Sequence, residues 1–288
     1  MGKSSKTIHL SPFKERLYIF IGCIPMITVM AISFCLLYQD YALNNYNFMG
    51  KSWHLSNVEK TSYDVKVSCI EFEYSDLRKK FPSCAPKNCF RYFTDFLISE
   101  NEGKTLLKMA HKGWLQTDDS DSASFLSVEK GTIINGNSVT KLKENLYSEE
   151  ELLTYKNVKQ SILNHVKTKF GVKNLYLTNE NQFTKLSNNN PKSEQSKYWI
   201  PKIDKNDREW QQYSVILFLN DFMADFYGSR EVFENLNSSM ILTIQPKLAR
   251  VLVYSPGSEN KHFFERLEYG ISYAIRIPLT CDEKIKSN

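Results

Sequence analysis

The most informative stretch of the chain is VYSPGSENKHFFERLEYGISYAI, residues 253–275. It begins with branched and aromatic residues typical of a strand, turns at Pro256 and Gly257, and becomes apolar again after Gly270. Runs of the same kind lie nearby, at 213–219, 240–244, 250–254 and 271–279. Short strands spaced this densely, with Gly and Pro between them, predict a β-sandwich or a barrel-like core.

The clearest helix signal lies upstream of these strands, at 148–170. Ser148 and Glu151 match a capping box, and Gly171 stands where a helix normally ends. Apolar residues recur at the spacing of one helix face, which we expect to pack on a sheet: Leu152, Tyr155, Val158, Ile162, Val166 and Phe170. A long helix followed by many short strands predicts an α+β fold.

Shorter segments lie in the first half of the chain. Val65, Val67 and Cys69 alternate as they would in a strand, and 172–177 is also expected to be a strand. Helical spacing occurs at 104–112, and in Cys89, Phe93, Phe96 and Leu97. We therefore expect two short helices between the first strand and the long helix.

Residues 17–38, LYIFIGCIPMITVMAISFCLLY, contain no charged side chain. At about 1.5 Å per residue, a helix of this length spans roughly 33 Å, close to the hydrocarbon thickness of a bilayer. A cleaved signal peptide is the competing interpretation, but its apolar core would be shorter and would end at a small-residue cleavage site. We therefore predict an uncleaved transmembrane helix, with a tail at 1–16 before it and a stem at 39–60 after it.

The charges around this span predict its orientation. Four basic residues precede it, Lys3, Lys6, Lys14 and Arg16, whereas Asp40 follows it. The positive-inside rule then places the amino terminus in the cytoplasm, as in a single-pass type II membrane protein. The domain at 61–288 would face the lumen of the endoplasmic reticulum or Golgi, or the cell exterior. It contains a glycosylation sequon at Asn237.

The net formal charge of the chain is +5, and the first 16 residues carry +3 of it. What remains is too small for the basic surface that binds nucleic acids. The sequence therefore excludes a nucleic-acid partner. It predicts a membrane partner for residues 17–38 and a lumenal protein or peptide partner for the folded domain.

Four cysteines follow the span: Cys69, Cys84, Cys89 and Cys281. An even number in an oxidising compartment predicts disulfides, although four cysteines allow three connectivities. Cys84 and Cys89 are close enough in the chain to pair with each other. A zinc site is the alternative, but no second Cys pair or paired His stands at ligand spacing.

Three stretches carry a resemblance to a known family: YWIPKIDK at 198–205, YSVILFLND at 213–221, and residues 253–275. In order and spacing they resemble the Fe(II)/2-oxoglutarate oxygenases of the prolyl-4-hydroxylase type. The resemblance also includes FPSCAPKNCFRYFTDF at 81–96, so it covers most of the chain after the span. It implies a double-stranded β-helix, or jelly roll, with its core at about 172–281. It also implies Fe(II) and 2-oxoglutarate as cofactors.

In such enzymes two His and one carboxylate hold the iron, and a basic residue about ten positions after the second His binds 2-oxoglutarate. The first His and the carboxylate form an H-x-D motif on a strand. In this chain Asp204 matches the carboxylate and His262 matches the second His. Lys202 stands at the first His position, and Ser272 stands at the position of the basic residue.

Other residues near these positions also depart from the family. Residues 228–233 resemble its Gly-Gly-x-Phe-x-Phe turn into a strand, but Ser229 and Glu231 differ. Arg276 lies on the same strand face as Ser272 but about 13 Å further along, too far to replace the missing basic residue unless the pocket is shifted. No histidine of the chain is followed two residues later by Asp or Glu, so none restores the motif.

These replacements lead to two hypotheses. A charged lysine repels Fe(II) at ligand distance, and serine cannot make the bidentate ion pair of an arginine. The first hypothesis is therefore a non-catalytic binding module built on an oxygenase fold. The alternative is an active or residual hydroxylase of a lumenal protein. At the site itself, Lys202 either forms an ion pair with Asp204 or extends to solvent.

Overall fold

The computed structural model describes residues 30, 32–33, 60–117, 121–234 and 241–287. The chain divides into two compact units, Met1–Ser52 and Trp53–Asn288. In the first unit only Met30, Ile32 and Ser33 are described, and they are helical. The rest of the predicted span, the stem up to residue 59 and Asn237 lie outside the described residues. Within the described part, no helix is long and apolar enough to cross a bilayer.

The second unit is built on a ten-stranded antiparallel sheet. Its strands, in spatial order, are β1 (Ser62–Val67), β2 (Cys89–Thr94), β12 (Val251–Tyr254), β8 (Tyr213–Phe218), β15 (Ser272–Thr280), β7 (Gln182–Leu186), β3 (Ala123–Ser127), β4 (Thr132–Asn135) and β5 (Ser138–Lys141). The tenth strand, β6 (Tyr176–Leu177), pairs with β15. β8 and β12 at the centre are buried along their whole length.

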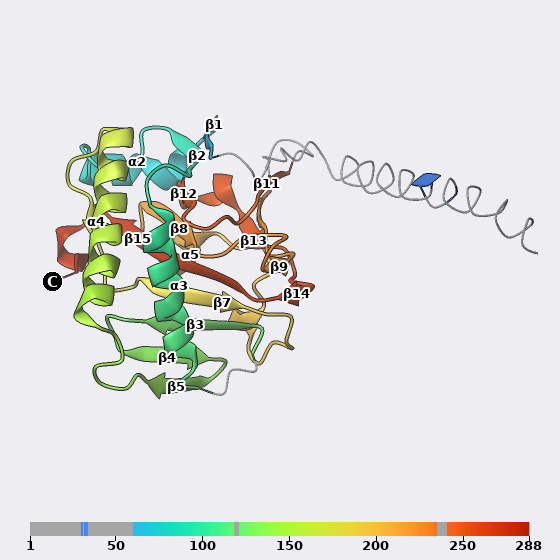
Figure 1. The fold of residues 1–288 in the computed structure, drawn as a ribbon. Coiled ribbons are helices and arrows are strands. Elements are labelled where there is room, and N and C mark those ends of the chain that lie inside the picture. The colour runs from blue at the N-terminus through green and yellow to red at the C-terminus, as the bar shows by residue number, and fades with distance from the viewer. Residues whose placement is uncertain (1–29, 31, 34–59, 118–120, 235–240, 288) are drawn as a thin grey trace, which may run out of the picture. The chain divides into compact units, whose positions relative to one another are not determined.

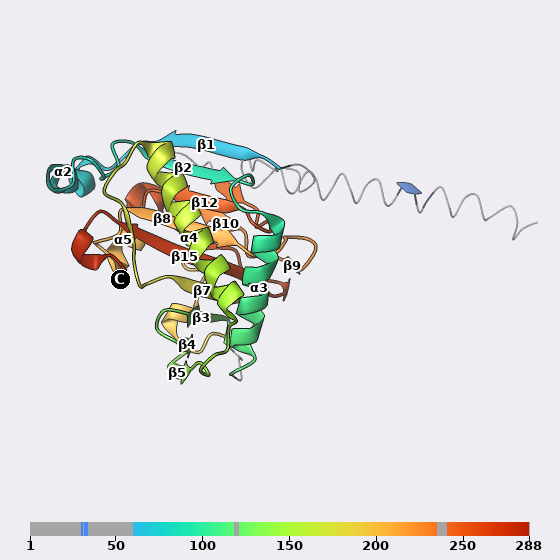
Figure 2. The ribbon, with the colours of Figure 1, turned by 60° about the vertical axis from the view of Figure 1, so that its left-hand side comes forward.

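Two long helices, α3 (Glu100–Trp114) and α4 (Glu149–Phe170), lie over one face of this sheet (Figures 1 and 2). The predicted cap of α4 is confirmed, because Ser148 and Glu151 form a capping box and Gly171 adopts the left-handed conformation. α3 begins with a second capping box, formed by Ser99 and Glu102. Apolar side chains of both helices pack on the sheet in one buried cluster.

A smaller sheet lies against the other face. It consists of β11 (Leu242–Ile244), β10 (Glu231–Phe233) and β13 (His262–Phe264). A second apolar cluster joins Phe233 and Phe264 of this sheet to Ile216 and Phe218 of β8. A separate ribbon pairs β9 (Phe226–Tyr227) with β14 (Tyr269–Gly270). The protein is therefore a mixed α/β structure with a sheet-rich core that resembles a jelly roll.

Short helices complete the fold. They are α2 (Glu71–Lys80), α5 (Asp204–Asp207) and the 3₁₀ turns η1 (Glu194–Ser196), η2 (Ser258–Asn260) and η3 (Glu283–Ile285). The periodicity of the sequence did not indicate α2, whose only fully buried residue is Tyr74. A helix with so little buried surface leaves no apolar stripe to detect.

One predicted helix is wrong. Cys89, Phe93, Phe96 and Leu97 showed helical spacing, but 89–94 form β2, in which every residue is buried. A strand covered on both faces loses the alternation of polar and apolar residues, so its pattern can be mistaken for a helix. The strand predicted at 172–177 is reduced to β6 at its end, and the helix predicted at 104–112 is part of the longer α3.

The four cysteines form two disulfides, Cys69–Cys89 and Cys84–Cys281. Cys84 and Cys89, near neighbours in the chain, do not pair with each other. Cys89 instead pairs with Cys69, two residues after the end of β1. β1 hydrogen-bonds to β2 along its whole length. Cys84 pairs with the residue that follows β15, so this bond joins segments separated by 197 residues.

Candidate functional site

Lys202, the residue at the expected first His position, lies beside His262. The two residues exchange both backbone hydrogen bonds, of 2.8 and 2.9 Å, in an isolated antiparallel bridge. Residues paired in this way place their side chains on the same side, so the lysine lies next to the imidazole. Burial lowers the pKa of Lys202 to about 8. The charge of Arg276 adds to this effect, whereas Asp204 and Glu231 oppose it.

Asp204 is the first residue of α5, not part of a strand as the H-x-D motif predicted. Its Oδ2 accepts hydrogen bonds from the hydroxyls of Ser214 and Tyr254, each of 2.7 Å. Burial acts to raise the pKa of this carboxyl, but the charges of His262 and Lys202 and the Ser214 hydrogen bond hold it well below its usual value. Asp204 is therefore a carboxylate at neutral pH. An ion pair with Lys202 is not among those formed by the described residues.

His262 begins β13 and is 1% exposed. Its Nδ1 lies 2.8 Å from the Asn260 carbonyl oxygen. A carbonyl only accepts, so Nδ1 carries the proton and Nε2 presents a lone pair to the site. Nε2 lies 3.2 Å from the Tyr254 hydroxyl and 3.6 Å from Asp204 Oδ1. Burial lowers the pKa of His262 to about 4, although Asp204 opposes this, so the ring is neutral at pH 7.

Glu231, at the start of β10, points into the same site. Its Oε1 lies 3.7 Å from His262 Nε2. The side chain is 0% exposed, and neither carboxyl oxygen has a hydrogen-bond partner. Burial raises the pKa of Glu231 to about 8, while Arg276 and Lys202 act to lower it. The sequence marked Glu231 only as a departure from a family motif, because nothing in the local pattern showed that it faces His262.

Arg276, not Ser272, is the residue of β15 whose charge reaches this site. Alternate residues of β15 face the two layers, with Ile275 in the helix-side cluster and Ala274 in the cluster beneath the small sheet. Arg276 shares the face of Ala274, and its guanidinium carbon lies 5.3 Å from the ring centroid of Phe264. Its Nε is buried and has no hydrogen-bond partner. Ser272 is buried at the beginning of the strand.

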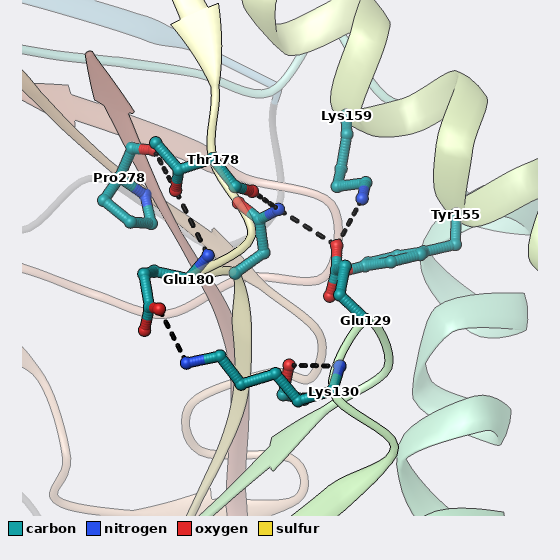
Figure 3. Close-up of polar contacts among 9 residues, drawn as sticks. Glu129, Lys130, Tyr155, Lys159, Thr178, Glu180 and Pro278 are labelled. Carbon is teal, nitrogen blue, oxygen red and sulfur yellow. Dashed lines mark hydrogen bonds and ion pairs between the residues drawn. The ribbon is translucent and has the colours of Figure 1, made fainter. Parts of the chain in front are cut away.

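A cavity of about 20 Å³ adjoins these groups. Asp204, Arg276 and Glu180 are among the residues that line it. Lys130 Nζ donates a hydrogen bond of 2.6 Å to the Glu180 carboxylate. The backbone N–H of Glu180 donates to the Thr178 hydroxyl. That hydroxyl donates in turn to the Pro278 carbonyl of β15 (Figure 3). These contacts fix the turn between β6 and β7 against β15, so the outer wall of the cavity is a supported structure.

The structure thus brings together Lys202, Asp204 and His262 from the sequence prediction and adds Glu231 and Arg276. Tyr254 completes the group, because its hydroxyl donates to Asp204 and its oxygen lies 3.2 Å from His262 Nε2. Across the described residues, no set of three or more His, Cys, Asp or Glu side chains is arranged to hold a metal ion. Asp204 and His262 remain the predicted metal ligands, and they are adjacent.

Similarity to known proteins assigns this chain to a class. The chain is 30% identical over 227 residues to 2-oxoglutarate and iron-dependent oxygenase domain-containing protein 3 of Mus musculus. The alignment covers 76% of this chain and 71% of that protein. The human protein of that name is 28% identical over the same length, covering 76% and 70%. The Xenopus tropicalis protein is 30% identical over 226 residues, covering 75% and 70%. No family model matches the chain.

Solved structures give a more distant similarity. A prolyl hydroxylase from Trichoplax adhaerens, in complex with a hypoxia inducible factor peptide, aligns with a TM-score of 0.49 and 14% identity, over 68% of this chain and 85% of that one. The viral collagen prolyl hydroxylase of Paramecium Bursaria Chlorella virus-1 aligns with a TM-score of 0.43 and 12% identity, over 67% and 96%.

The class is therefore that of the 2-oxoglutarate and iron-dependent oxygenases. Within it, the chain belongs to the family of 2-oxoglutarate and iron-dependent oxygenase domain-containing protein 3.

Proposed function

We propose that residues 61–288 form a non-catalytic, lumenal binding module built on the double-stranded β-helix of this family. The observation that carries the proposal is Lys202, a cationic side chain in the place of a histidine ligand, directly beside His262. The metal and the co-substrate make separate demands on the site.

The ligand set does not fit Fe(II). A facial triad needs three neutral or anionic donors on one side of the metal, and Asp204 and His262 supply two. Glu231 also faces His262, but among the described residues no three such side chains are arranged to hold a metal ion. Lysine binds a metal only after losing its proton, and its pKa of about 8 keeps most of it charged at neutral pH. The Oδ2 of Asp204 is also engaged by two hydroxyl donors. A ferrous ion placed here would have two protein ligands and a cation as its neighbour.

The surroundings do not fit 2-oxoglutarate either. Ser272 cannot form the ion pair that an arginine makes with a carboxylate. Arg276 does reach the site, but the cavity between it and Asp204 measures only about 20 Å³. That volume holds roughly one water molecule, whereas 2-oxoglutarate has roughly ten non-hydrogen atoms. Binding of the co-substrate would require the two sheets to move apart.

A larger hollow on the outside offers a surface for a partner. It measures about 520 Å³ and lies where α4 ends beside the segment that follows α2. Lys66, Lys87 and Lys173 are exposed there, and the one carboxylate in its lining, Asp64, is paired with Lys169 at 2.7 Å. The charge of this surface fits an acidic segment of a lumenal protein. Charge-reversed Lys87→Glu/Lys173→Glu should lose binding to an immobilised poly-glutamate peptide that the wild type retains.

The same proposal includes the membrane anchor. Residues 17–38 would span the bilayer once, with the folded domain in the endoplasmic reticulum, the Golgi or at the cell surface and with glycan at Asn237. The two disulfides support an oxidising compartment. A glycosidase-sensitive mass shift that disappears in Asn237→Gln would test the topology directly.

The alternative is an active or residual hydroxylase of a lumenal protein. It is favoured by one observation: Asp204 and His262 are still adjacent, with 3.6 Å between Oδ1 and Nε2. The third ligand would then have to come from water or from the substrate.

One experiment separates the two functions. The full chain, purified in detergent under anaerobic conditions, is supplied with Fe(II) and 2-oxoglutarate, and succinate is measured after oxygen is admitted. The binding module predicts no iron-dependent succinate from the wild type. Lys202→His/Ser272→Arg should gain iron binding, whereas the matched Lys197→His/Ser272→Arg, which alters a half-buried lysine paired with Glu194, should not. Succinate formation by the wild type would establish the alternative.

A further inference from the structure

The ten-stranded sheet ends on one side at β1, whose outer edge is paired with no other strand within the described part of the chain. β1 runs along the upper border of the sheet in Figure 2. Its side chains alternate between exposed and half-buried, and Ser62, Asp64 and Lys66 are the exposed ones. An open edge of this kind presents N–H and C=O groups to which a further strand can hydrogen-bond.

The hydrogen bonds between β1 and β2 show which backbone groups point outward. The pairing is antiparallel, and the Asp95 N–H donates to the Thr61 carbonyl at 3.0 Å, one residue before β1 begins. Hydrogen-bonded and non-bonded pairs alternate along such a ladder. The N–H and C=O groups of every second residue of β1 therefore point away from β2, and these residues are Ser62, Asp64 and Lys66.

The same residues border the basic hollow of about 520 Å³ at the end of α4. Asp64 and Lys66 line it, together with the exposed Lys87 and Lys173. Its one carboxylate, on Asp64, is already paired with Lys169 at 2.7 Å. In an antiparallel strand added to β1, the residues that hydrogen-bond to Asp64 and Lys66 place their side chains on this same side. An acidic residue opposite Lys66 therefore enters a surface with an excess of positive charge.

The opposite face of β1 favours apolar residues in the added strand. Tyr63, Val65 and Val67 point to that face and are half-buried. The Tyr63 ring stacks on Phe93 of β2, with 5.7 Å between the ring centroids. Apolar side chains at alternate positions of an added strand would cover the exposed part of these residues and gain stabilisation from burial. The edge thus selects a segment in which acidic and apolar residues alternate.

A second copy of this chain is a poorer occupant of the edge. Pairing two β1 strands would bring together two hollows that each contain more lysines than carboxylates. Like charges placed opposite each other cost free energy and suppress the wrong partner. A segment that carries the opposite charge meets no such repulsion.

We infer that β1 is a docking edge, to which an extended segment of a lumenal protein with alternating acidic and apolar residues adds as an antiparallel strand. This inference rests on the proposed binding function and specifies the manner in which the partner is recognised. In strand addition, backbone hydrogen bonds provide affinity and the alternate side chains provide specificity.

The test uses backbone N-methylation of a peptide probe, acetyl-Glu-Val-Glu-Val-Thr-Val-Thr-amide, whose binding to the full chain is measured in detergent. In the docked register its second glutamate and its two threonines lie opposite Lys66, Asp64 and Ser62. N-methylation of these three residues removes the N–H groups that face β1, so it should raise the dissociation constant by roughly tenfold or more. N-methylation of the three valines, whose N–H groups face away from β1, should change it by less than about threefold.

Charge-reversal variants make the result specific. Lys66→Glu should lose most of its affinity for the acidic probe and should bind instead the probe in which lysine replaces both glutamates. The matched Lys141→Glu changes an exposed lysine of β5, the strand at the other end of the sheet, and should bind the acidic probe like the wild type.

Three results overturn the inference. The first is that the unmodified probe does not bind, or that both N-methylated probes bind alike. The second is that Lys66→Glu and Lys141→Glu bind the acidic probe equally well. The third is that the wild type is a dimer that the probe dissociates, because a second copy of the chain then occupies the edge.

These measurements also separate this inference from the proposed function. If the wild type forms succinate with Fe(II) and 2-oxoglutarate, the non-catalytic function fails, whereas the N-methylated probes still decide the strand addition. If Lys87→Glu/Lys173→Glu loses poly-glutamate binding but the two N-methylated probes bind alike, the basic surface is retained and only the strand addition is wrong.

Discussion

The two faces of the ten-stranded sheet bury different kinds of side chain, although the same strands supply both. On β8 and β15, Val215, Leu217, Ile275 and Ile277 face the helices and belong to one apolar cluster. The residues that alternate with them face the small sheet, where the charged and polar groups around Ser214 and Arg276 lie beside the second apolar cluster. Side chains alternate along a strand, so one residue of register separates a dry core from a polar site.

This difference shows which face was free to change. The helix side is filled by close packing, where even one methylene more or less is costly. The inner side depends on a balance of charges, which different residues can supply in different combinations. The proposed function has ligands replaced on the inner face while the fold is kept.

The largest effect is expected for the disulfide at the end of the helix-side core, Cys84–Cys281. Both residues belong to the helix-side cluster, and the bond closes a loop of 197 residues, against 20 for Cys69–Cys89. Chain entropy then predicts a loss of about 5 kcal/mol for Cys84→Ser/Cys281→Ser and about 3 kcal/mol for Cys69→Ser/Cys89→Ser. Urea unfolding measures both, and equal losses would contradict the entropic explanation.

The second prediction uses two neighbours on β15. Ile275→Ala should reduce the free energy of unfolding by about 2–5 kcal/mol, because it leaves a cavity on the packed face. Arg276→Met should also destabilise the protein, because it leaves Glu231 and Asp204 with one cation fewer.

The combination with Glu231→Gln distinguishes the two faces. Adding Glu231→Gln to Arg276→Met should recover about 1 kcal/mol or more of the lost free energy of unfolding. Adding it to Ile275→Ala should recover none. Additive effects at both positions would mean that the inner face is not organised by charge balance.

The third prediction concerns the stability of the folded protein at low pH. Arg250 donates two hydrogen bonds to Asp95, of 2.7 and 2.9 Å, on the inner side of the sheet. Burial acts to raise the pKa of Asp95, but the bonds and charge of Arg250 lower it below its usual value. A depressed folded-state pKa stabilises the protein above the unfolded pKa of about 3.9, and this is lost as the pH falls through the folded pKa.

We therefore expect wild-type stability to fall as the pH drops below about 4, with part of the loss coming from this group. Asp95→Asn should be less stable at pH 7 but should lack this part of the acid loss. Urea unfolding of the wild type and of Asp95→Asn, each at pH 7 and at pH 3, would measure this difference in acid sensitivity. An unchanged acid slope in Asp95→Asn would assign the loss to other carboxyls.

The smallest effect is expected at the cap of α4, on the helix side. The Ser148 hydroxyl accepts the Glu151 N–H at 3.2 Å. Ser148→Ala should cost about 1 kcal/mol, whereas Ser161→Ala, at an exposed position inside the same helix, should be neutral or slightly stabilising. Thermal unfolding of the two variants checks this, and an equal effect would show that the cap contributes nothing.

Local patterns predicted much of the fold. The capping box and apolar stripe located α4, and branched runs located β8, β12 and β15. Patterns failed where burial was on both faces, as in β2, or nearly absent, as in α2. In both cases the periodicity that distinguishes helix from strand is missing.

The sequence by itself gave the expectation that Lys202, Asp204, His262 and Ser272 stand at the site positions of the family, because the resemblance is carried by short motifs in the right order. Only the tertiary structure decided that Glu231 and Arg276 join them, that Asp204 begins a helix, and how the four cysteines pair. These residues lie on different elements, and the distance between those elements depends on which side chains pack between the two sheets. Chain order carries no record of that packing.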